Sequence, residues 1–388
     1  MRRMMFLVLF AAMALPAGAA KRVTVAQLSQ ALAAATNAHR ADAETARQIA
    51  SMELSERLTD ETLSRLTSHL DARSQTALAL QLLADQSAFL DPPASELPAT
   101  AAPDDAAQQR MLAAARGYVA KTLPRLPNFL ATRTINRFDD SPQVLKTGAW
   151  PVRAGLHFVG TSSREVSVRD ERENQPPAQG SAVWREQIGL ISGGEFGTTL
   201  GMILTDTLQG KVAWSHWEQT VAGPAAVFQF TVPKFASHFE IMGTLQGQAA
   251  LEGHATRAAG GRGIAGIGAQ PSSVGSTNAS IIHSRPGYHG SLWLDPATGT
   301  ILRITMEADP KDSAPFRRAA IMVKYGPVEI GDGRFICPVR SLALSIATAD
   351  ADALTGSAPT EWLNETLFTG YHRFAATTRI LTDTAPPQ

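Results

Sequence analysis

The sequence has a single cysteine, no excess of charge of either sign and few aromatic residues. Cys337 is the one cysteine among 388 residues, which excludes an intrachain disulfide and any zinc or iron–sulfur site built from several cysteines. Lys and Arg together number 35, and so do Asp and Glu, so the chain lacks the basic excess typical of proteins that bind nucleic acids or anionic membranes. We therefore expect no nucleic-acid partner.

Long hydrophobic runs are also missing beyond the first 20 residues. These residues begin with Arg2 and Arg3, continue with an apolar stretch from Met4 to Leu15, and end in small residues up to Ala20. This order is typical of a secretory signal peptide, and the stretch is too short to span a bilayer. We predict an exported protein, periplasmic or extracellular, that is soluble or peripherally associated with the cell envelope and has no transmembrane span.

Residues 21–90 have the apolar spacing of amphipathic helices. Apolar residues recur three or four positions apart, as at Leu28, Leu32 and Ala35. Thr24 followed by Gln27 matches a capping box, and breaks near residues 37–42 and 71–74 predict four short helices. We expect a small helical bundle here, followed by a linker at 91–107 that is rich in Pro, Ala and acidic residues.

From residue 108 to about residue 384 most segments alternate apolar and polar residues, as strands do. Tight hairpin turns are indicated at Asp295–Gly299 and Gly331–Gly333, and one helix at about Glu195–Leu208. The predicted fold class is therefore α+β: the helical bundle precedes a large curved antiparallel β-sheet, similar to an open barrel, with one or two packed helices. A glycine-rich stretch at about 247–290 predicts a flexible insertion.

Several segments of the sheet domain carry a resemblance to known proteins: Leu126-Pro127-Asn128-Phe129, Thr132, Thr134, Arg137, Gly194-Glu195-Phe196-Gly197, Trp293–Gly299 and Tyr325–Ile330. With these segments the chain resembles, over about residues 104–380, an uncharacterised family of exported bacterial proteins. The family often has a cysteine near Leu130 and Ala131, which is absent here, so a shared thiol chemistry is not expected. The Trp-x-Asp-Pro-x-Thr-Gly hairpin at Trp293–Gly299 also resembles those of lipoprotein-localisation carriers and related periplasmic lipid-binding proteins, which implies an unclosed barrel with helices at its mouth.

Common catalytic signatures are absent from the sequence. It contains no His-Glu-x-x-His, Gly-x-Ser-x-Gly, Ser-x-x-Lys or phosphate-loop motif. Gly261–Gly266 matches the dinucleotide-binding pattern, but the glycines and proline that follow are incompatible with the helix this motif requires. His238 with Glu240, and His283 with His289, lack a third metal ligand at a recognisable spacing. We predict no catalytic residue, no cofactor and no metal.

The sequence favours non-catalytic binding of an apolar ligand or lipid by the curved sheet. An open sheet partly covered by a helix leaves an apolar cleft, which is the usual form of a site for acyl chains. The residues proposed for its wall are Phe228, Phe230, Val232, Trp293, Ile301 and Ile304.

Two alternatives stay open at this point. The first is an interaction or scaffold protein that docks an envelope protein through residues 21–90. The second is a hydrolase with an unrecognised site near His216, which stands on the same side of a predicted strand as Trp214 and Glu218. Cys337, by contrast, lies in an apolar strand and is expected to be an inert buried thiol.

Overall fold

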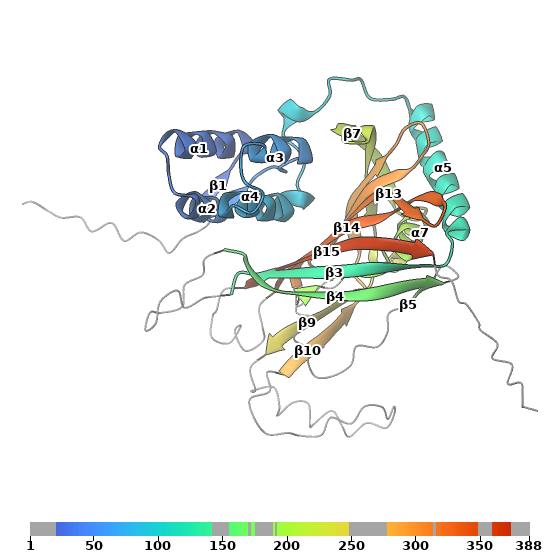
Figure 1. Cartoon of the computed structure of the whole chain (residues 1–388). Helices are drawn as coiled ribbons and strands as arrows, with labels where there is room; N and C mark the ends of the chain where they lie inside the picture. Colours follow the sequence, from blue (N-terminus) through green and yellow to red (C-terminus); the bar gives the residue numbers. More distant parts are fainter. Residues whose placement is uncertain are drawn as a thin grey trace, which may run out of the picture.

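The computed structural model describes residues 21–141, 155–169, 172–174, 189–190, 192–247, 278–312, 316–347 and 359–373. The predicted signal peptide (1–20), residues 248–277 of the predicted insertion and residues 374–384 of the predicted sheet domain lie outside the described residues. Figure 1 shows two parts, a group of N-terminal helices in blue and a large sheet with further helices on its other side.

The N-terminal part is a helical module, defined here as residues 21–96. Its amphipathic helices share one apolar core around Leu28, Ile49 and Leu80. The predicted capping box of Thr24 and Gln27 is present, and the four predicted helices are confirmed. A short parallel pair of strands was not expected from the sequence. The module contains β1 (Lys21–Val23), α1 (Val25–Asn37), α2 (Asp42–Ala50), β2 (Met52–Leu54), α3 (Asp60–Thr67), α4 (Gln75–Gln86), and the 3-10 helices η1 (Ser87–Phe89) and η2 (Ala94–Glu96).

The predicted linker is partly ordered. Its first residues belong to the module, because they include η2 and because the backbone N–H of Arg57 donates to the carbonyl oxygen of Asp91 at 2.8 Å. After the linker, the sequence also predicts a helix capped by Asp104 or Asp105. Helix α5 (Asp105–Thr122) is this helix, and the carboxylate of Asp104 accepts a hydrogen bond from the backbone N–H of Ala107 at 2.6 Å. The 3-10 helix η3 (Leu123–Arg125) continues α5 toward the first strand of the sheet.

Ten strands form one antiparallel sheet, in the order β5-β4-β3-β15-β14-β13-β12-β11-β8-β7. The sheet is open, and register shifts in several pairs bend the strands, so the predicted curved α+β fold is confirmed. Segments 335–339 and 342–346, which the sequence suggests as two strands, form one. The strands are β3 (Phe129–Asp139), β4 (His157–Arg169), β5 (Arg172–Asn174), β7 (Lys211–Thr220), β8 (Gly223–Val232), β11 (Tyr288–Leu294), β12 (Ile301–Ala308), β13 (Phe316–Ile330), β14 (Gly333–Ala347) and β15 (Thr360–Arg373).

A second, smaller sheet contains three strands in the order β10-β9-β6. Its strands β6 (Gly189–Leu190), β9 (Ile241–Gly247) and β10 (Asn278–Ser284) are antiparallel, and β9 pairs with both neighbours. Residues 278–284 are thus in a strand, and β11 begins at Tyr288, so the last part of the predicted insertion is regular sheet.

We call the side of the large sheet that contacts α5 and α7 (Thr198–Asp206) its inner face. Alternate residues of the strands point to this side, and they pack with Ala115 and Val119 of α5 and with Leu200 and Ile203 of α7. The helix expected at about Glu195–Leu208 is therefore present, although it begins at Thr198. The 3-10 helix η4 (Lys234–Ala236) closes the end of this core.

The helical module covers the opposite side of the sheet, which we call the outer face (Figure 1). Here Ala88 at the end of the module packs against Met322, Leu342 and Leu344. This docking was not anticipated from the sequence, because the module has a complete apolar core of its own. Among the described helices, none is both long and apolar enough to cross a membrane.

Candidate functional site

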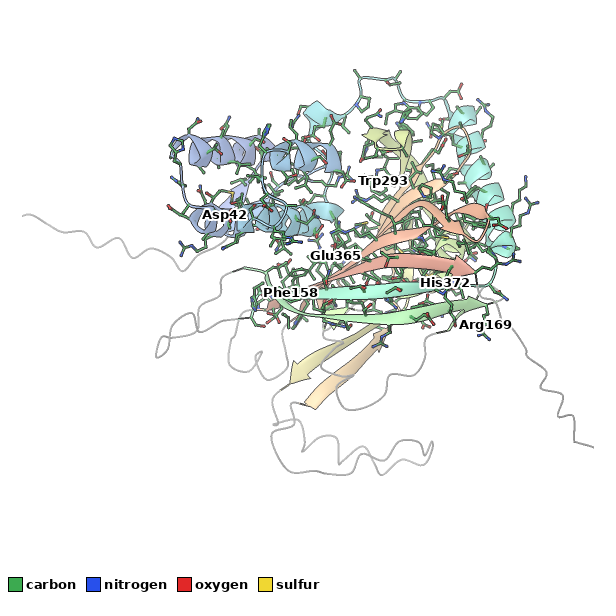
Figure 2. All side chains as sticks on the ribbon, in the orientation of Figure 1. Asp42, Phe158, Arg169, Trp293, Glu365 and His372 are labelled. Atoms are coloured by element: carbon green, nitrogen blue, oxygen red, sulfur yellow. The ribbon has the colours of Figure 1, made fainter. Side chains whose placement is uncertain are left out.

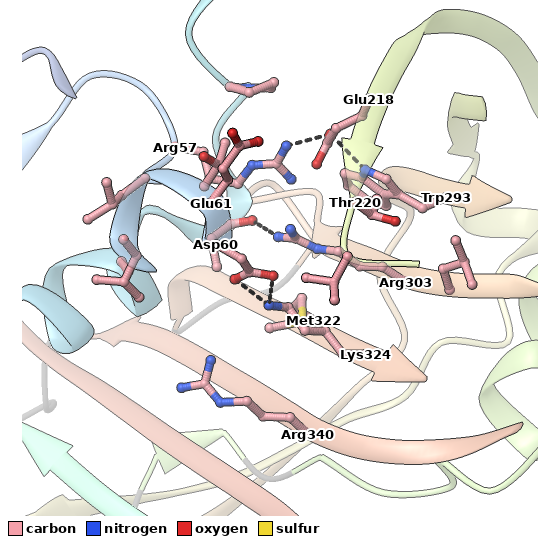
Figure 3. A pocket seen from close by; sticks show the side chains of 18 of the residues that line it. Arg57, Asp60, Glu61, Glu218, Thr220, Trp293, Arg303, Met322, Lys324 and Arg340 are labelled. Carbon is pink, nitrogen blue, oxygen red and sulfur yellow. Dashed lines mark hydrogen bonds and ion pairs between the residues drawn. The ribbon is translucent and has the colours of Figure 1, made fainter. Parts of the chain in front are cut away.

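A cavity of about 510 Å³ lies between the helical module and the outer face (Figure 3), and we call it the module–sheet cleft. The module contributes residues within 57–64 and 81–96, and the sheet contributes residues of β7, β11, β12, β13 and β14 together with the β7–β8 turn. Its volume is in the range of small-molecule sites, and its position between two structural units is also typical of them.

A row of cations crosses the sheet side of the cleft. Arg303 on β12 is directly opposite Lys324 on β13, and Lys324 is directly opposite Arg340 on β14. Trp293 on β11 continues the row, because it is the cross-strand partner of Arg303. Like charges directly opposite one another destabilise a sheet, so this row requires counter-charges.

Carboxylates supply those counter-charges for two of the three cations. The Lys324 ammonium lies 2.6 Å from the carboxylate of Asp60 at the start of α3. The Arg340 guanidinium lies 2.7 Å from Asp85 of α4 and 2.6 Å from Glu365 of β15. Burial raises the pKa of Asp85 to about 6, with the nearby Glu365 acting in the same direction and Arg340 against it. These ion pairs connect the module to the sheet.

Arg303 is different, because it has no carboxylate partner among the described residues. Its Nη2 donates to the backbone carbonyl oxygen of Ala88, its Nε is buried without a hydrogen-bond partner, and its guanidinium carbon lies 4.6 Å from the centre of the Trp293 ring. Burial, and then the neighbouring charge of Arg57, lower the pKa of Arg303. The charges of Glu218 and Asp60 act in the opposite direction. Since an arginine stays charged at neutral pH, Arg303 is a cation without a carboxylate in direct contact among the described residues.

A second cluster joins the module to the far end of the row. The carboxylate of Glu218 on β7 accepts from Arg57 Nη2 at 2.6 Å and from the Trp293 indole N–H at 2.8 Å, and its Oε2 lies 3.3 Å from Nε2 of His216. Burial by itself disfavours the charged form of this carboxyl, but the hydrogen bond with His216 and the charge of Arg57 outweigh burial and lower the pKa of Glu218 to about 2. Figure 3 shows Arg57, Glu218 and Trp293 in this arrangement.

Arg57 itself is only 2% exposed, and its Nε and Nη1 have no hydrogen-bond partner. Its guanidinium carbon lies 5.4 Å from the centre of the Trp293 ring, so two guanidinium groups lie over one indole. The remaining wall of the cleft is mainly apolar and includes Leu63, Ala84, Leu302, Met322, Val339 and Leu342. The cleft therefore combines an apolar wall with two buried guanidinium groups, those of Arg57 and Arg303, whose N–H donors are only partly satisfied.

The six residues proposed from the sequence for a ligand wall are divided between the two faces. Five of them are at most 2% exposed and belong to the inner core with α5 and α7, namely Phe228, Phe230, Val232, Ile301 and Ile304. Trp293 lies on the outer face and lines the module–sheet cleft, since its neighbours Leu292 and Leu294 point inward. Figure 2 shows Trp293 and Glu365 near the module, whereas Arg169 and His372 lie at the other end of the strands.

His216 and Glu218, the residues considered for a hydrolase, are close together, with Glu218 Oε2 3.3 Å from Nε2 of His216. Ser215, which the sequence places on the other side of the strand, also reaches this histidine, because its Oγ lies 2.9 Å from His216 Nδ1. A register shift between Trp214 and His216 places Ser215 in a bulge of β7, which brings its hydroxyl to the histidine.

Two other titratable residues noted in the sequence, Cys337 and His238, have contacts that give them a role in stability. Cys337 is buried in an apolar cluster, and burial raises its thiol pKa to about 12. His238 Nδ1 lies 2.6 Å from the buried carboxylate of Asp206, which also accepts from the hydroxyl of Tyr288. Among the described residues, no group of three His, Cys, Asp or Glu side chains is arranged to hold a metal ion.

Sequence reasoning missed Arg57, Arg303, Lys324 and Arg340. Each of the last three stands in an otherwise apolar strand, which is a signal of a buried or functional charge. Their alignment depends on strand register, and Arg57 reaches them only because the module docks on the outer face. Local patterns contain neither kind of information.

No protein-family model, curated protein or solved structure matches this chain. The resemblances to an exported family and to lipoprotein-localisation carriers therefore stay predictions. Arguments about function rest on the geometry of the cleft.

Proposed function

We propose that this chain is an exported, non-catalytic binding protein of the cell envelope that holds a small molecule in the module–sheet cleft. The observation that carries the proposal is the cavity of about 510 Å³, which has both an apolar wall and buried polar donors without partners. Buried polar groups are normally hydrogen-bonded, and unsatisfied ones concentrate where a ligand completes them. The proposal keeps the ligand-binding function expected from the sequence but assigns it to the outer face.

The inner face is a less suitable site for the same ligand. The side chains expected to form an apolar wall there, such as Phe228 and Ile304, are fully buried against helix side chains. A ligand on that face would have to displace α5 or α7, at the cost of a close-packed core. The cleft needs no such displacement, because its space is already present between the module and the sheet.

The test is native mass spectrometry of protein exported and purified without detergent, followed by solvent extraction. We expect a bound small molecule in the unmodified protein. Ser64 is an exposed residue of α3 that lines the cleft, so Ser64→Trp should obstruct the cleft and remove the bound mass. Gln30→Trp, at an exposed position of α1 away from the cleft, is the matched control and should keep it. Apo protein that also fails to bind a neutral apolar dye would contradict the proposal.

A second candidate is hydrolysis, favoured by the connected side chains of Ser215, His216 and Glu218. A serine, a histidine and a carboxylate in hydrogen-bond contact are the components of nucleophilic catalysis, in which the histidine activates the hydroxyl. A fluorophosphonate probe should then label the protein, and Ser215→Ala should abolish the labelling. An unlabelled, folded wild-type protein would rule this candidate out.

The third possibility, an envelope partner that docks through residues 21–90, stays a prediction. One side of the module is occupied by its own sheet, where Ala88 is buried against Met322. A protein partner would have to use a surface of the module that the sheet leaves free, such as that around Leu78 of α4, which is 55% exposed. A partner that competes with the sheet for Ala88 is not compatible with this packing.

A further inference from the structure

We infer that the ligand of the module–sheet cleft is an organic anion whose carboxylate or phosphate group binds Arg303 and whose apolar body lies along Leu63, Leu302 and Val339. The inference rests on the proposed function, because it names the chemical class of the ligand in the same cleft. Its basis is the one cation of the row that lacks a carboxylate partner within the described part of the chain.

Arg303 is the cation of the cleft that no carboxylate contacts among the described residues. The carboxylates of Asp60, Asp85 and Glu218 are already committed to Lys324, Arg340 and Arg57 respectively. Two further carboxylates line the cleft: Glu96 accepts hydrogen bonds from the hydroxyl groups of Thr59 and Thr62, and Glu61 stands at an exposed position of α3. Arg303 lies directly opposite Lys324 in the sheet and close enough to Arg57 for the two charges to disfavour each other. An anion bound at Arg303 would relieve this repulsion, whereas a neutral ligand would not.

The donors also have the right chemistry for such a group. A guanidinium presents its N–H groups in a planar fork that matches a carboxylate or a phosphate. The Trp293 ring lies against the guanidinium of Arg303, and the indole is itself held by its hydrogen bond to Glu218 at 2.8 Å. Arg57, which is 2% exposed, places a second buried cation beside the same cleft. The donors are thus held in place before a ligand binds, which reduces the entropy lost on binding.

The rest of the cleft indicates that the anion carries an apolar body. Leu63 on the module faces the cleft from one side, and Leu302 and Val339 line it from the sheet. All three side chains are only half-buried. An inorganic anion alone would leave this wall uncovered, whereas an alkyl or aromatic group would contact it.

The experiment compares four probes that share one alkyl chain and differ in their head group: dodecanoate, dodecyl phosphate, dodecanol and dodecylamine. Isothermal titration calorimetry of the full-length mature protein should show that at least one of the two anions binds about tenfold or more tightly than dodecanol, with dodecylamine weakest. The tighter of the two anionic probes identifies the head group. We expect Arg303→Met to reduce the affinity for that anion to the level of dodecanol, and Arg303→Lys to keep part of the preference.

Arg318→Met is the matched control. Arg318 lies on the same face of β13 but outside the cleft, where it pairs with Glu307 at 3.0 Å, so its loss should not change binding of any probe. Circular dichroism and thermal melts establish that each variant is folded.

Three outcomes overturn the inference. Equal binding of dodecanol and the anions, unaffected by Arg303→Met, would refute the anionic class while leaving the proposed binding function in place. A preference for anions that survives Arg303→Met would refute the assignment to Arg303. If none of the probes binds and native mass spectrometry finds only apo protein, the proposed function fails and this inference with it.

Discussion

The two faces of the ten-stranded sheet bury their side chains in different ways. On the inner face, Phe228, Ile304 and their neighbours pack against α5 and α7, and the buried carboxylate of Asp206 is satisfied by His238 and Tyr288. On the outer face, three cations stand in register beneath the module, and one of them lacks a counter-ion among the described residues. Both faces carry helices, and the outer one retains a cavity between the module and the sheet.

This difference suggests that the two faces have different roles, one in stability and the other in binding. Burial of apolar side chains stabilises the fold wherever it occurs, whereas buried polar groups without partners cost free energy. Proteins commonly keep such costs where a ligand or a reaction requires them. The inner face is therefore expected to dominate the free energy of unfolding, and the outer face is expected to dominate binding.

The largest effect should come from the inner face. Phe228→Ala removes a fully buried ring that contacts Trp214 edge-on, with the ring centres 5.5 Å apart. We expect the free energy of unfolding to fall by about 4 kcal/mol, because the cavity left behind cannot collapse completely. Urea denaturation measures this change. Phe235→Ala, at a ring that is 82% exposed, is the control and should change stability by less than about 0.5 kcal/mol. Similar losses for both would mean that the inner core is not close-packed.

The next effect should come from the ion pair that joins the module to the sheet. Arg57→Met leaves Glu218 without its main cation in a site where its side chain is 12% exposed, and we expect a loss of about 3 kcal/mol in unfolding free energy. The comparison variant is Arg22→Met, whose partner Glu53 is exposed, and this change should have no measurable effect. An unchanged free energy of unfolding in Arg57→Met would show that the pair contributes nothing to docking of the module.

Which residues share the inner face was largely predictable from the sequence, because this depends on the pattern of neighbouring residues within one strand. Phe228, Phe230 and Val232 alternate with polar residues along β8, and a period of two assigns them to one side without knowledge of their neighbours. Helix caps at Thr24 and Asp104 are also local signals, and both are present in the structure. The turn at Gly331, with a φ of 61°, was predictable for the same reason.

The outer site was not predictable, because it depends on contacts between residues far apart in the chain. Arg303, Lys324 and Arg340 form a row only after three strands pair in one register. The sequence did not indicate that the module docks on this face and brings Asp60 and Arg57 to the row. Trp293 was assigned to the same wall as Phe228 and Ile304, but its flanking leucines point inward, so that Trp293 itself faces the cleft.

A change of pH should act on the outer face in a defined direction. The pKa of Glu218 is lowered in the folded state to about 2, from an ordinary value of 4.5, so its contribution to stability is present above about pH 4.5 and is lost as the pH falls toward 2. Between pH 5 and pH 3 the wild type should lose about 2 kcal/mol more than Glu218→Gln does. Urea denaturation of both proteins at the two pH values measures the difference. Equal losses in both proteins would mean that Glu218 is not held ionised by Arg57 and His216.

The smallest effect on stability should come from Arg303→Met. This variant tests whether a residue of the outer face serves binding without contributing to stability. Its removal leaves no carboxylate unpaired among the described residues, and a methionine of similar length can still cover Trp293. The lost hydrogen bond to Ala88 opposes the gain from removing a desolvated charge, so we expect a change within about 1 kcal/mol of zero, or a small stabilisation. Arg57→Met, by contrast, breaks an ion pair on the same indole. If thermal and urea denaturation showed equal losses for the two variants, Arg303 would be a structural residue like Arg57, and the case for an anion in the cleft would lose its basis.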